Sequence, residues 1–350
     1  MNKITSREFG HTKDGKKVTI FSLCNPHGVT INILDYGATI QSIFVPNKDN
    51  ELIDIVLGYD DITSYENGSC FFGAVVGRFA NRIAYSRFLL DDKEYRLEKP
   101  VNELHHVHGV FPYRMFKAFI DNDTLVLKYL SPDGEEGFPG NLNLEVRYSL
   151  DEDNSLIIDY KATCDRPTVI NLTNHTYFNL NGQDGSTIFE HKVKLNSGYF
   201  TEYDSSFAQT GNIISVDGTP LDFKDEHTVG ERFYDDYYQL RLCDGYDHNM
   251  IINGKDNELK LMGTIYNPST GIMVEAFTTE PAFQFYSGRY IQYDTGGLGK
   301  NRIKYPKYGG LCLEAQHYPD SPNHPNFPST ILRPEETYIQ KTIYKFITEK

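Results

Sequence analysis

The sequence predicts an all-β protein, folded as a large antiparallel β-sandwich or barrel. Three observations support this prediction. Apolar and polar residues alternate with a period of two from end to end, turn residues separate the alternating segments, and no segment carries an apolar stripe of helical period over more than about three turns. Successive side chains of a strand point to opposite faces of the sheet, so half-buried strands alternate in this way. Many short strands joined by short turns are typical of sandwiches and barrels.

Five segments carry the clearest alternation. The predicted strands are Lys17 to Leu23, Val29 to Leu34, Thr124 to Leu130, Leu142 to Leu150 and Ser155 to Lys161. Turn signals fall between predicted strands at Asp14-Gly15, Asn67-Gly68, Pro132-Asp133-Gly134, Asn181-Gly182 and Asn253-Gly254. Their spacing suits hairpins and short loops.

The chain shows no linker rich in Pro or Ser, no low-complexity run and no fixed-period repeat. We therefore expect a single domain over residues 1–350. The stretch at 294–330 is too long for a hairpin turn, and long loops on a rigid β scaffold often carry function.

Charge and hydropathy narrow the range of partners. Acidic residues outnumber basic ones, 48 to 34, which gives a net charge of −14. This charge repels nucleic acid and anionic lipid, so a neutral small molecule is the expected partner. The N-terminal sequence has no apolar run that could serve as a secretory signal, and nowhere do about 18 consecutive apolar residues appear. We expect a cytoplasmic monomer or homodimer that does not bind a membrane.

The cysteines and aromatic residues add two expectations. Five cysteines are scattered along the chain without a C-x-x-C pair, which indicates neither a disulfide framework nor a structural zinc site. The chain has 25 Tyr and 22 Phe but no Trp. If a sugar ring stacks on an aromatic side chain here, that side chain must be Tyr or Phe.

Glu314 is the first candidate for a functional side chain. In a strand through this segment, Cys312 and Glu314 share one face, while Leu311, Leu313 and Ala315 take the other. Burying an ionised carboxylate costs several kcal/mol unless it is paired. Glu314 is therefore either a functional carboxylate in an apolar run or a surface residue at the end of a strand.

Other polar residues also have structural interpretations. His175 lies between Asn174 and Thr176, where a histidine is more often a hydrogen-bonded structural residue than a catalyst. Asp247 follows Gly-Tyr and could form a turn. The pair Asn81-Arg82 could hold a loop in place.

Three closely spaced histidines, His105, His106 and His108, suggest a metal site, because imidazoles are common ligands of zinc and copper. In a strand, His106 and His108 would share a face with His105 on the other. Neither an H-E-x-x-H helix nor a matching cysteine set accompanies them. We therefore expect no metal and no other cofactor.

Six segments taken together carry more information than any one of them. They are Gly77 to Ile83, Asn102 to His105, Asn174 to Leu180, Tyr246 to Asn249, Gln284 to Tyr286 and Leu313 to Asn323. In this order they resemble the galactose mutarotase (aldose 1-epimerase) family, with its patterns G-R-x-A-N-R-I, N-x-L-H, N-H-x-Y-F-N-L, Y-D-H-N, Q-F-Y and L-E-x-Q-x-x-P-D-x-x-N. The resemblance spans nearly the whole chain.

The resemblance implies the β-supersandwich fold and the interconversion of α and β anomers of a free hexose such as galactose or glucose, without cofactor or metal. It implies that Glu314 is the general base and His175 the general acid. The sugar binders that it implies are Asn81, Arg82, His105, Tyr177, Asp247 and Gln284.

One segment departs from the family pattern. The family usually reads L-H-G-G, where this chain has Leu104 followed by His105, His106 and Val107. An alignment without a gap selects His105 and places Phe111 and Phe116 on the family's downstream aromatic positions. A short gap would instead select His108, which precedes Gly109. We prefer His105.

Three alternatives compete with anomer interconversion. A glycoside hydrolase would use Asp247 and Glu314 as its carboxylate pair. A noncatalytic sugar-binding module would share the scaffold and the aromatic residues. A hexose-phosphate epimerase would need a basic cluster, which could be formed by Arg289, Lys300, Arg302, Lys304 and Lys307.

Overall fold

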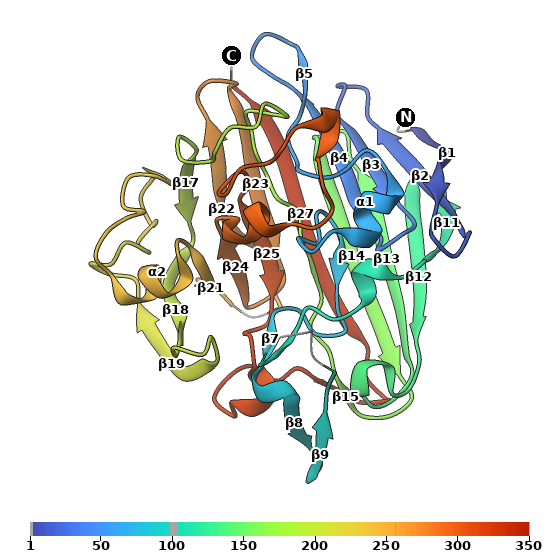
Figure 1. The fold of residues 1–350 in the computed structure, drawn as a ribbon, viewed down its shortest axis with the longest axis vertical. Coiled ribbons are helices and arrows are strands. Elements are labelled where there is room, and N and C mark those ends of the chain that lie inside the picture. Colours follow the sequence, from blue (N-terminus) through green and yellow to red (C-terminus); the bar gives the residue numbers. More distant parts are fainter. Residues whose placement is uncertain (1–2, 99–103, 256, 350) are drawn as a thin grey trace.

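The computed structural model describes residues 3–98, 104–255 and 257–349, and most of these residues lie in strands (Figure 1). Two α-helices of six residues each are present, α1 (Ile62–Asn67) and α2 (Tyr238–Cys243). Short 3-10 turns occur at Ala84–Ser86, Phe111–Tyr113, Glu135–Gly137, Arg289–Tyr293, Lys300–Arg302 and Ser321–Asn323. No helix in the described ranges is long and apolar enough to cross a membrane.

A nine-stranded sheet is the largest element of the fold. In spatial order it contains β11 (Lys117–Asp121), β12 (Thr124–Ser131), β13 (Leu142–Leu150), β14 (Ser155–Cys164), β27 (Tyr338–Thr348), β23 (Ile272–Thr278), β22 (Lys260–Asn267), β17 (Lys192–Leu195) and β20 (His227–Thr228). The C-terminal strand β27 pairs with β14 and β23, so the end of the chain joins the two halves of this sheet.

Two five-stranded sheets complete the large layers. The first has the order β1 (Lys3–His11), β2 (Lys17–Cys24), β3 (Thr30–Leu34), β4 (Ile40–Pro46) and β5 (Leu52–Asp54). The second has the order β19 (Gln209–Ser215), β18 (Ser197–Tyr203), β21 (Asp247–Ile252), β24 (Ala282–Tyr286) and β25 (Cys312–Gln316).

The described residues also form four two-stranded ribbons. They are β6 (Val75–Val76) with β16 (Thr173–Asn174), β7 (Arg82–Ile83) with β10 (His106–Val107), β8 (Arg87–Leu90) with β9 (Lys93–Arg96), and β15 (Thr168–Val169) with β26 (Ile331–Leu332). All four ribbons are antiparallel.

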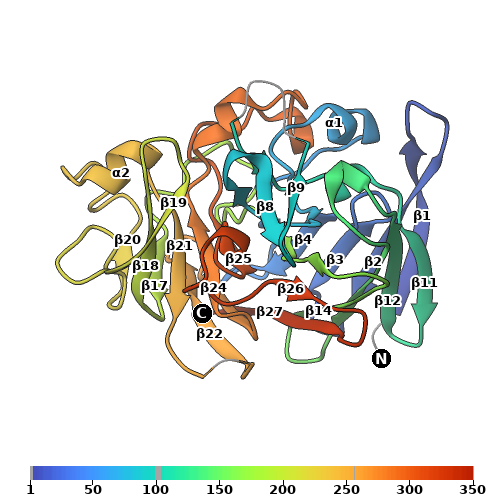
Figure 2. The ribbon, with the colours of Figure 1, turned by 90° about the horizontal axis from the view of Figure 1, so that it is seen from below.

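One hydrophobic cluster joins the three large sheets. It contains Ile31 from β3, Val146 from β13, Val274 from β23, and Phe283 and Leu313 from β24 and β25, all at most 1% exposed. In Figure 2, β14, β27 and β22 of the nine-stranded sheet form the lower layer, with β3, β4 and β25 above them. The predicted antiparallel β-sandwich is therefore confirmed, and the sheets share the buried apolar surface that stabilises them.

The predicted strands are confirmed to within three residues at each end. Strand β13 has the predicted bounds, and β14 runs three residues past the predicted Lys161. One turn prediction is wrong, because Asn67 ends α1 and Gly68 is its C-cap residue. The hydroxyl-rich helix sequence ITSYEN has too few apolar residues to show a helical period.

A buried ion pair ties the loop after β24 to the first five-stranded sheet. Lys300 is 3% exposed, and its Nζ donates to Asp54 Oδ2 at 2.5 Å and to the Gln41 carbonyl at 2.8 Å. The other carboxylate oxygen of Asp54 accepts from the backbone N–H of Ile43 at 3.1 Å. The pair therefore holds residues from opposite ends of the chain together.

We predict that Lys300→Met lowers the free energy of unfolding by about 3 to 5 kcal/mol, because it leaves the Asp54 carboxylate buried without its cation. The double variant Lys300→Met/Asp54→Asn should recover part of this loss. Arg302→Met is the matched control, since Arg302 is exposed in the same loop, and it should change stability by less than about 0.5 kcal/mol. Urea unfolding measures all three, and equal stability of Lys300→Met and Arg302→Met would contradict the prediction.

Candidate active site

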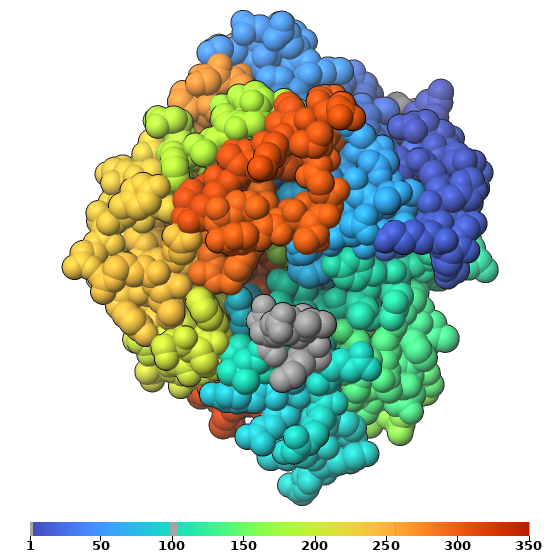
Figure 3. Space-filling view, in the orientation of Figure 1, coloured from blue at the N-terminus to red at the C-terminus, as the bar shows by residue number. Residues whose placement is uncertain are grey.

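A cavity of about 540 Å³ lies where loops from both halves of the chain meet. Figure 3 shows the surface hollowed between the orange segment that follows β24 and the cyan segments of the N-terminal half. Pockets of this size accommodate small organic ligands. Seven of the eight predicted site residues line the cavity: Asn81, Arg82, His175, Tyr177, Asp247, Gln284 and Glu314.

Strand register places the polar groups of the cavity on one face of the second five-stranded sheet. Residues directly opposite one another on antiparallel strands share a face. Gln284 of β24 lies opposite Asn249 of β21 on one side and opposite Glu314 of β25 on the other. Asp247 begins β21 and lies opposite Tyr286 of β24. The interpretation of Asp247 as a turn residue is therefore wrong, because the turn lies at Asp244 and Gly245.

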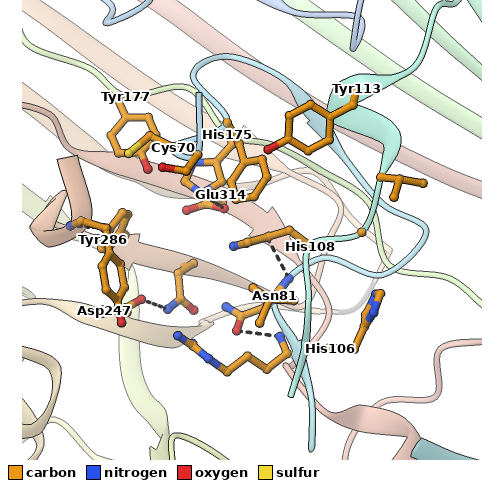
Figure 4. A pocket seen from close by; sticks show the side chains of 18 of the residues that line it. Cys70, Asn81, His106, His108, Tyr113, His175, Tyr177, Asp247, Tyr286 and Glu314 are labelled. Atoms are coloured by element: carbon orange, nitrogen blue, oxygen red, sulfur yellow. Dashed lines mark hydrogen bonds and ion pairs between the residues drawn. The ribbon is translucent and has the colours of Figure 1, made fainter. Parts of the chain in front are cut away.

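His175 follows β16 and faces Glu314 across the cavity (Figure 4). The separation between His175 Nε2 and Glu314 Oε2 is 3.7 Å. The imidazole stacks on the Tyr177 ring, with centroids 4.8 Å apart and planes 11° from parallel. This stacking fixes the plane of the ring and keeps Nε2 directed at the carboxyl group.

Burial controls the protonation of both groups. It lowers the pKa of His175 to about 4, an effect that the nearby Asp247 carboxylate partly opposes. Burial raises the pKa of Glu314 well above 4.5, and the negative charge of Asp247 raises it further. Glu314 Oε2 has no hydrogen-bond partner among the described residues. Burial thus favours the neutral form of both groups, with a shared proton on Glu314 rather than on His175.

Amide side chains hold Asp247 in place. Gln284 Nε2 donates to Asp247 Oδ1 at 2.6 Å. Gln316 Nε2 in turn donates to Gln284 Oε1 at 3.3 Å and to Asn249 Oδ1 at 3.0 Å. These hydrogen bonds hold the Asp247 carboxylate in place. Its negative charge acts on both His175 and Glu314.

The histidine of this segment that packs against His175 is His108, and the preference for His105 is wrong. His108 lines the cavity, and its ring centroid is 5.1 Å from that of His175. His105 instead accepts from the Tyr85 backbone N–H through Nδ1 at 3.0 Å and contacts the Ser206 carbonyl through Nε2 at 2.7 Å. The alignment with a short gap, which selects His108, is therefore the one that agrees with the structure.

Backbone geometry explains why His108 enters the cavity. Strand β10 ends at Val107, and both His108 and Gly109 have positive φ, 60° and 76°. A Cβ on Gly109 would lie 2.3 Å from the Gly77 carbonyl oxygen, so only glycine fits there. The expected strand alternation therefore stops before His108. Asn102, which lies outside the described residues, cannot be compared.

Asn81 positions the His108 ring. The Asn81 N–H donates to His108 Nδ1 at 3.3 Å, and the His108 N–H donates to the Asn81 carbonyl at 3.1 Å. Because Nδ1 accepts a hydrogen bond, the proton of the neutral imidazole resides on Nε2. Arg82 lies beside this pair, with its guanidinium 5.4 Å from the Phe207 ring centroid.

The three neighbouring histidines do not form a metal site. His105 and His108 have the separate partners already described, and His106 Nδ1 contacts the Glu98 carbonyl at 2.7 Å. Each ring is thus held by a different part of the chain. Among the described residues, the only group of donors close enough to hold a metal consists of His175, Cys312 and Glu314.

Several cavity residues escaped the sequence analysis. Cys70, Phe71, Tyr113 and Tyr290 line the cavity, and the Phe71 ring centroid is 5.2 Å from that of His108. Glu136 also lines it, and burial raises its pKa to about 7. These residues lie outside the family motifs, and the high aromatic content was the only signal that rings would form the wall.

The basic residues considered for a phosphate site do not converge. Lys300 is buried against Asp54. Lys307 pairs with Asp244 at 2.5 Å, and the Arg289 guanidinium lies 4.8 Å from the Phe207 ring centroid. None of the five predicted basic residues lines the cavity. The structure therefore gives no support to the alternative of a hexose-phosphate epimerase.

The sequence and the fold both have known relatives. Residues 19–345 match the sequence model of the family described as Aldose 1-epimerase. The chain belongs to the aldose 1-epimerase family. It is 37% identical to the galactose mutarotase of Bos taurus over 90% of each chain, and 36% identical to the aldose 1-epimerase of Escherichia coli (strain K12) over 96% of this chain and 97% of that protein.

Solved structures of relatives have the same fold. An aldose epimerase homologue from C. elegans superposes with a TM-score of 0.86 and 30% identity, covering 95% of this chain and 99% of the other. The galactose 1-epimerase from Lactobacillus acidophilus superposes with a TM-score of 0.84 and 25% identity over the full length of both chains. The fold expected from the resemblance is thereby confirmed.

The location of His108 leads to a prediction for a pair of variants. His108→Ala should lower kcat/KM for anomer interconversion by about tenfold or more, because it removes a hydrogen-bonding group from the cavity. His105→Asn should leave kcat/KM within about twofold of the parent, since His105 lies outside the cavity. Polarimetry measures both rates. A larger loss for His105→Asn than for His108→Ala would contradict the placement.

Proposed function

We propose that this protein interconverts the α and β anomers of a free hexose by opening and reclosing the sugar ring. The observation that carries the proposal is the buried pair of Glu314 and His175, 3.7 Å apart in a cavity lined by hydrogen-bonding side chains and aromatic rings. Ring opening requires one group that accepts a proton and one that donates a proton. The relatives named galactose mutarotase and aldose 1-epimerase support the same reaction.

The proposed mechanism moves one proton through each residue. Glu314, as carboxylate, accepts the proton of the anomeric hydroxyl, while His175, as imidazolium, donates a proton to the ring oxygen. The bond between the anomeric carbon and the ring oxygen then breaks. The aldehyde turns about the bond to its neighbouring carbon, and the two residues return their protons as the ring closes on the other face. No net change in oxidation state or in protein protonation results.

The pKa shifts of the two residues fit this order of steps. In the ring-opened state Glu314 carries the proton and His175 is neutral, which is the distribution that burial favours. The reactive distribution has the same total of one proton but places it on His175. Asp247 favours that imidazolium through its negative charge. The sugar hydroxyls that replace water in the cavity would complete the shift by donating hydrogen bonds to Glu314 Oε2.

Sugar binding is assigned to the polar residues around the pair. Asp247 accepts from Gln284 through one oxygen, so its other oxygen remains available for a sugar hydroxyl. Arg82 and the Nε2–H of His108 offer donors, and Asn81 holds His108 in place. Tyr177 supports the His175 ring from behind rather than presenting a face to the sugar. A flat apolar sugar face would instead pack on the aromatic wall.

The alternative enzymes receive less support. A glycoside hydrolase needs a carboxyl group as its acid, and here the group beside Glu314 is the imidazole of His175. A noncatalytic sugar-binding module has no need for an acid and a base in contact. Polarimetry of freshly dissolved α-sugar, together with an assay for reducing sugar released from a glycoside, separates the three functions.

We also propose that the protein acts in the cytoplasm. The support is that all five cysteines are unpaired thiols, as is usual in a reducing compartment.

We predict that Glu314→Gln, and separately His175→Asn, each lower kcat by about two to four powers of ten, because each removes one of the two proton-transferring groups. Glu314→Gln keeps the size of the side chain, and His175→Asn keeps a smaller polar side chain, so circular dichroism should show an unchanged fold. The rate of change in optical rotation, corrected for the spontaneous reaction, measures the loss. Near-parental kcat in either variant would remove that residue from the mechanism.

The pKa shifts predict an unusual pH profile. A second proton binds to the pair only as pH falls towards about 4, the lowered pKa of His175. The single proton leaves only above the pKa of Glu314, which lies well above 4.5. Activity requires one proton on the pair, so on the acid side kcat/KM should fall only as the pH drops towards about 4, the lowered pKa of His175. A decline centred at about pH 6.5, the ordinary value for histidine, would contradict this prediction.

A further inference from the structure

The thiol of Cys312 belongs to the polar face of β25 but has no part in the proposed reaction. Cys312 and Glu314 are two residues apart on this strand, so they share a face, and both are buried. The Cys312 Sγ lies 3.7 Å from His175 Nδ1. Sulfur, imidazole nitrogen and carboxylate oxygen therefore meet at the wall of the cavity.

The three donor atoms are close enough to share one ion. One ligand atom from each of His175, Cys312 and Glu314 can be chosen so that all lie within 4.8 Å of one another. Zinc binds sulfur at about 2.3 Å and nitrogen or oxygen at about 2.0 to 2.2 Å, so tetrahedral ligands lie about 3.3 to 3.6 Å apart. The separations of 3.7 Å that His175 makes to the thiol and to the carboxyl group are close to this range. They involve opposite ring nitrogens, Nδ1 and Nε2, of which one ion can bind only one. Ion binding therefore requires the thiol or the carboxyl group to move towards the nitrogen that the ion uses.

Two of the three donors favour an ion, whereas burial raises the pKa of the Cys312 thiol, so the ion must displace its proton. Glu314 Oε2 is buried and has no hydrogen-bond partner in the described part of the chain. Glu314 lines the cavity that an ion would enter. The His175 imidazole is neutral at pH 7 and offers a lone pair. A thiolate ligand selects zinc and other thiophilic ions over magnesium or calcium.

We propose that His175, Cys312 and Glu314 form an inhibitory binding site for Zn²⁺ or a similar thiophilic divalent cation. The ion displaces the thiol proton and the proton of the His175–Glu314 pair, and both protons pass to solvent. Three protein ligands leave a fourth position open towards the cavity, where water binds. Because the ion occupies the acid and the base, bound metal and anomer interconversion exclude each other.

Cobalt absorption tests the site without relying on activity. Co²⁺ added to the metal-free full chain should give visible bands of a tetrahedral ion and a near-ultraviolet band from thiolate bonding. Cys312→Ser should lose the thiolate band. Cys164→Ser is the matched control, because Cys164 is also buried but contacts the Leu332 carbonyl on another sheet, and it should keep the band.

Zinc inhibition provides a second readout, which rests on the proposed function. Zn²⁺ should slow the change in optical rotation of fresh α-sugar. Its half-inhibitory concentration should rise about tenfold or more in Cys312→Ser and stay unchanged in Cys164→Ser. Cys312→Ala serves the same purpose if the serine variant does not fold.

The outcomes separate the two proposals. A thiolate band that persists in both Cys312 variants, or that disappears in Cys70→Ser instead, overturns the assignment of Cys312. Absence of the band in the parent protein overturns the site altogether, whatever the enzymatic activity. If the band behaves as expected but no sugar is interconverted, the metal site stands and the proposed function fails.

Discussion

The antiparallel register of β21, β24 and β25 is the constraint on which the candidate site depends. It places Gln284 between Asn249 and Glu314, and Asp247 one pair further along. Because facing residues on paired strands share a face, polar side chains that are far apart in the sequence meet in one row. A slip of one residue would turn Glu314 into the apolar core and Leu313 into the cavity. Burial of the hydrophobic face of β25 therefore fixes the register that places the carboxyl group in the cavity.

That position determines the chemistry of the pair. A carboxyl group without a hydrogen-bond partner in a buried wall binds its proton more tightly than one in water. The imidazole beside it loses affinity for a proton for the same reason. Between about pH 4 and the raised pKa of Glu314, the two groups consequently hold one proton between them, and burial favours its location on Glu314. Asp247, held by Gln284 and through it by Gln316, supplies a fixed negative charge that raises the pKa of both groups.

The remaining walls depend on contacts between distant segments. The ribbon of β7 and β10 brings Asn81 against His108. The Lys300–Asp54 pair anchors the loop after β24 to the first five-stranded sheet. Rings such as Phe71 and Tyr290 fill the space between these supports. The cavity is thus rigid on the strand side and closed by loops that are pinned at a few buried points.

The sequence by itself determined the strands, the sandwich and most of the site. Alternation with a period of two is a local pattern, so the ends of β13 could be predicted correctly. The family motifs identified Glu314, His175 and Asp247, because each motif is a short run of neighbouring residues. The choice between His105 and His108 needed the tertiary structure. It depends on positive φ at two residues and on the approach of Gly109 to the Gly77 carbonyl, a contact between segments that no local pattern encodes. The same reason applies to the burial of Lys300 and to the meeting of Cys312 with His175. Pairing across the fold decides which polar groups lose water, and burial in turn decides their protonation and their partners.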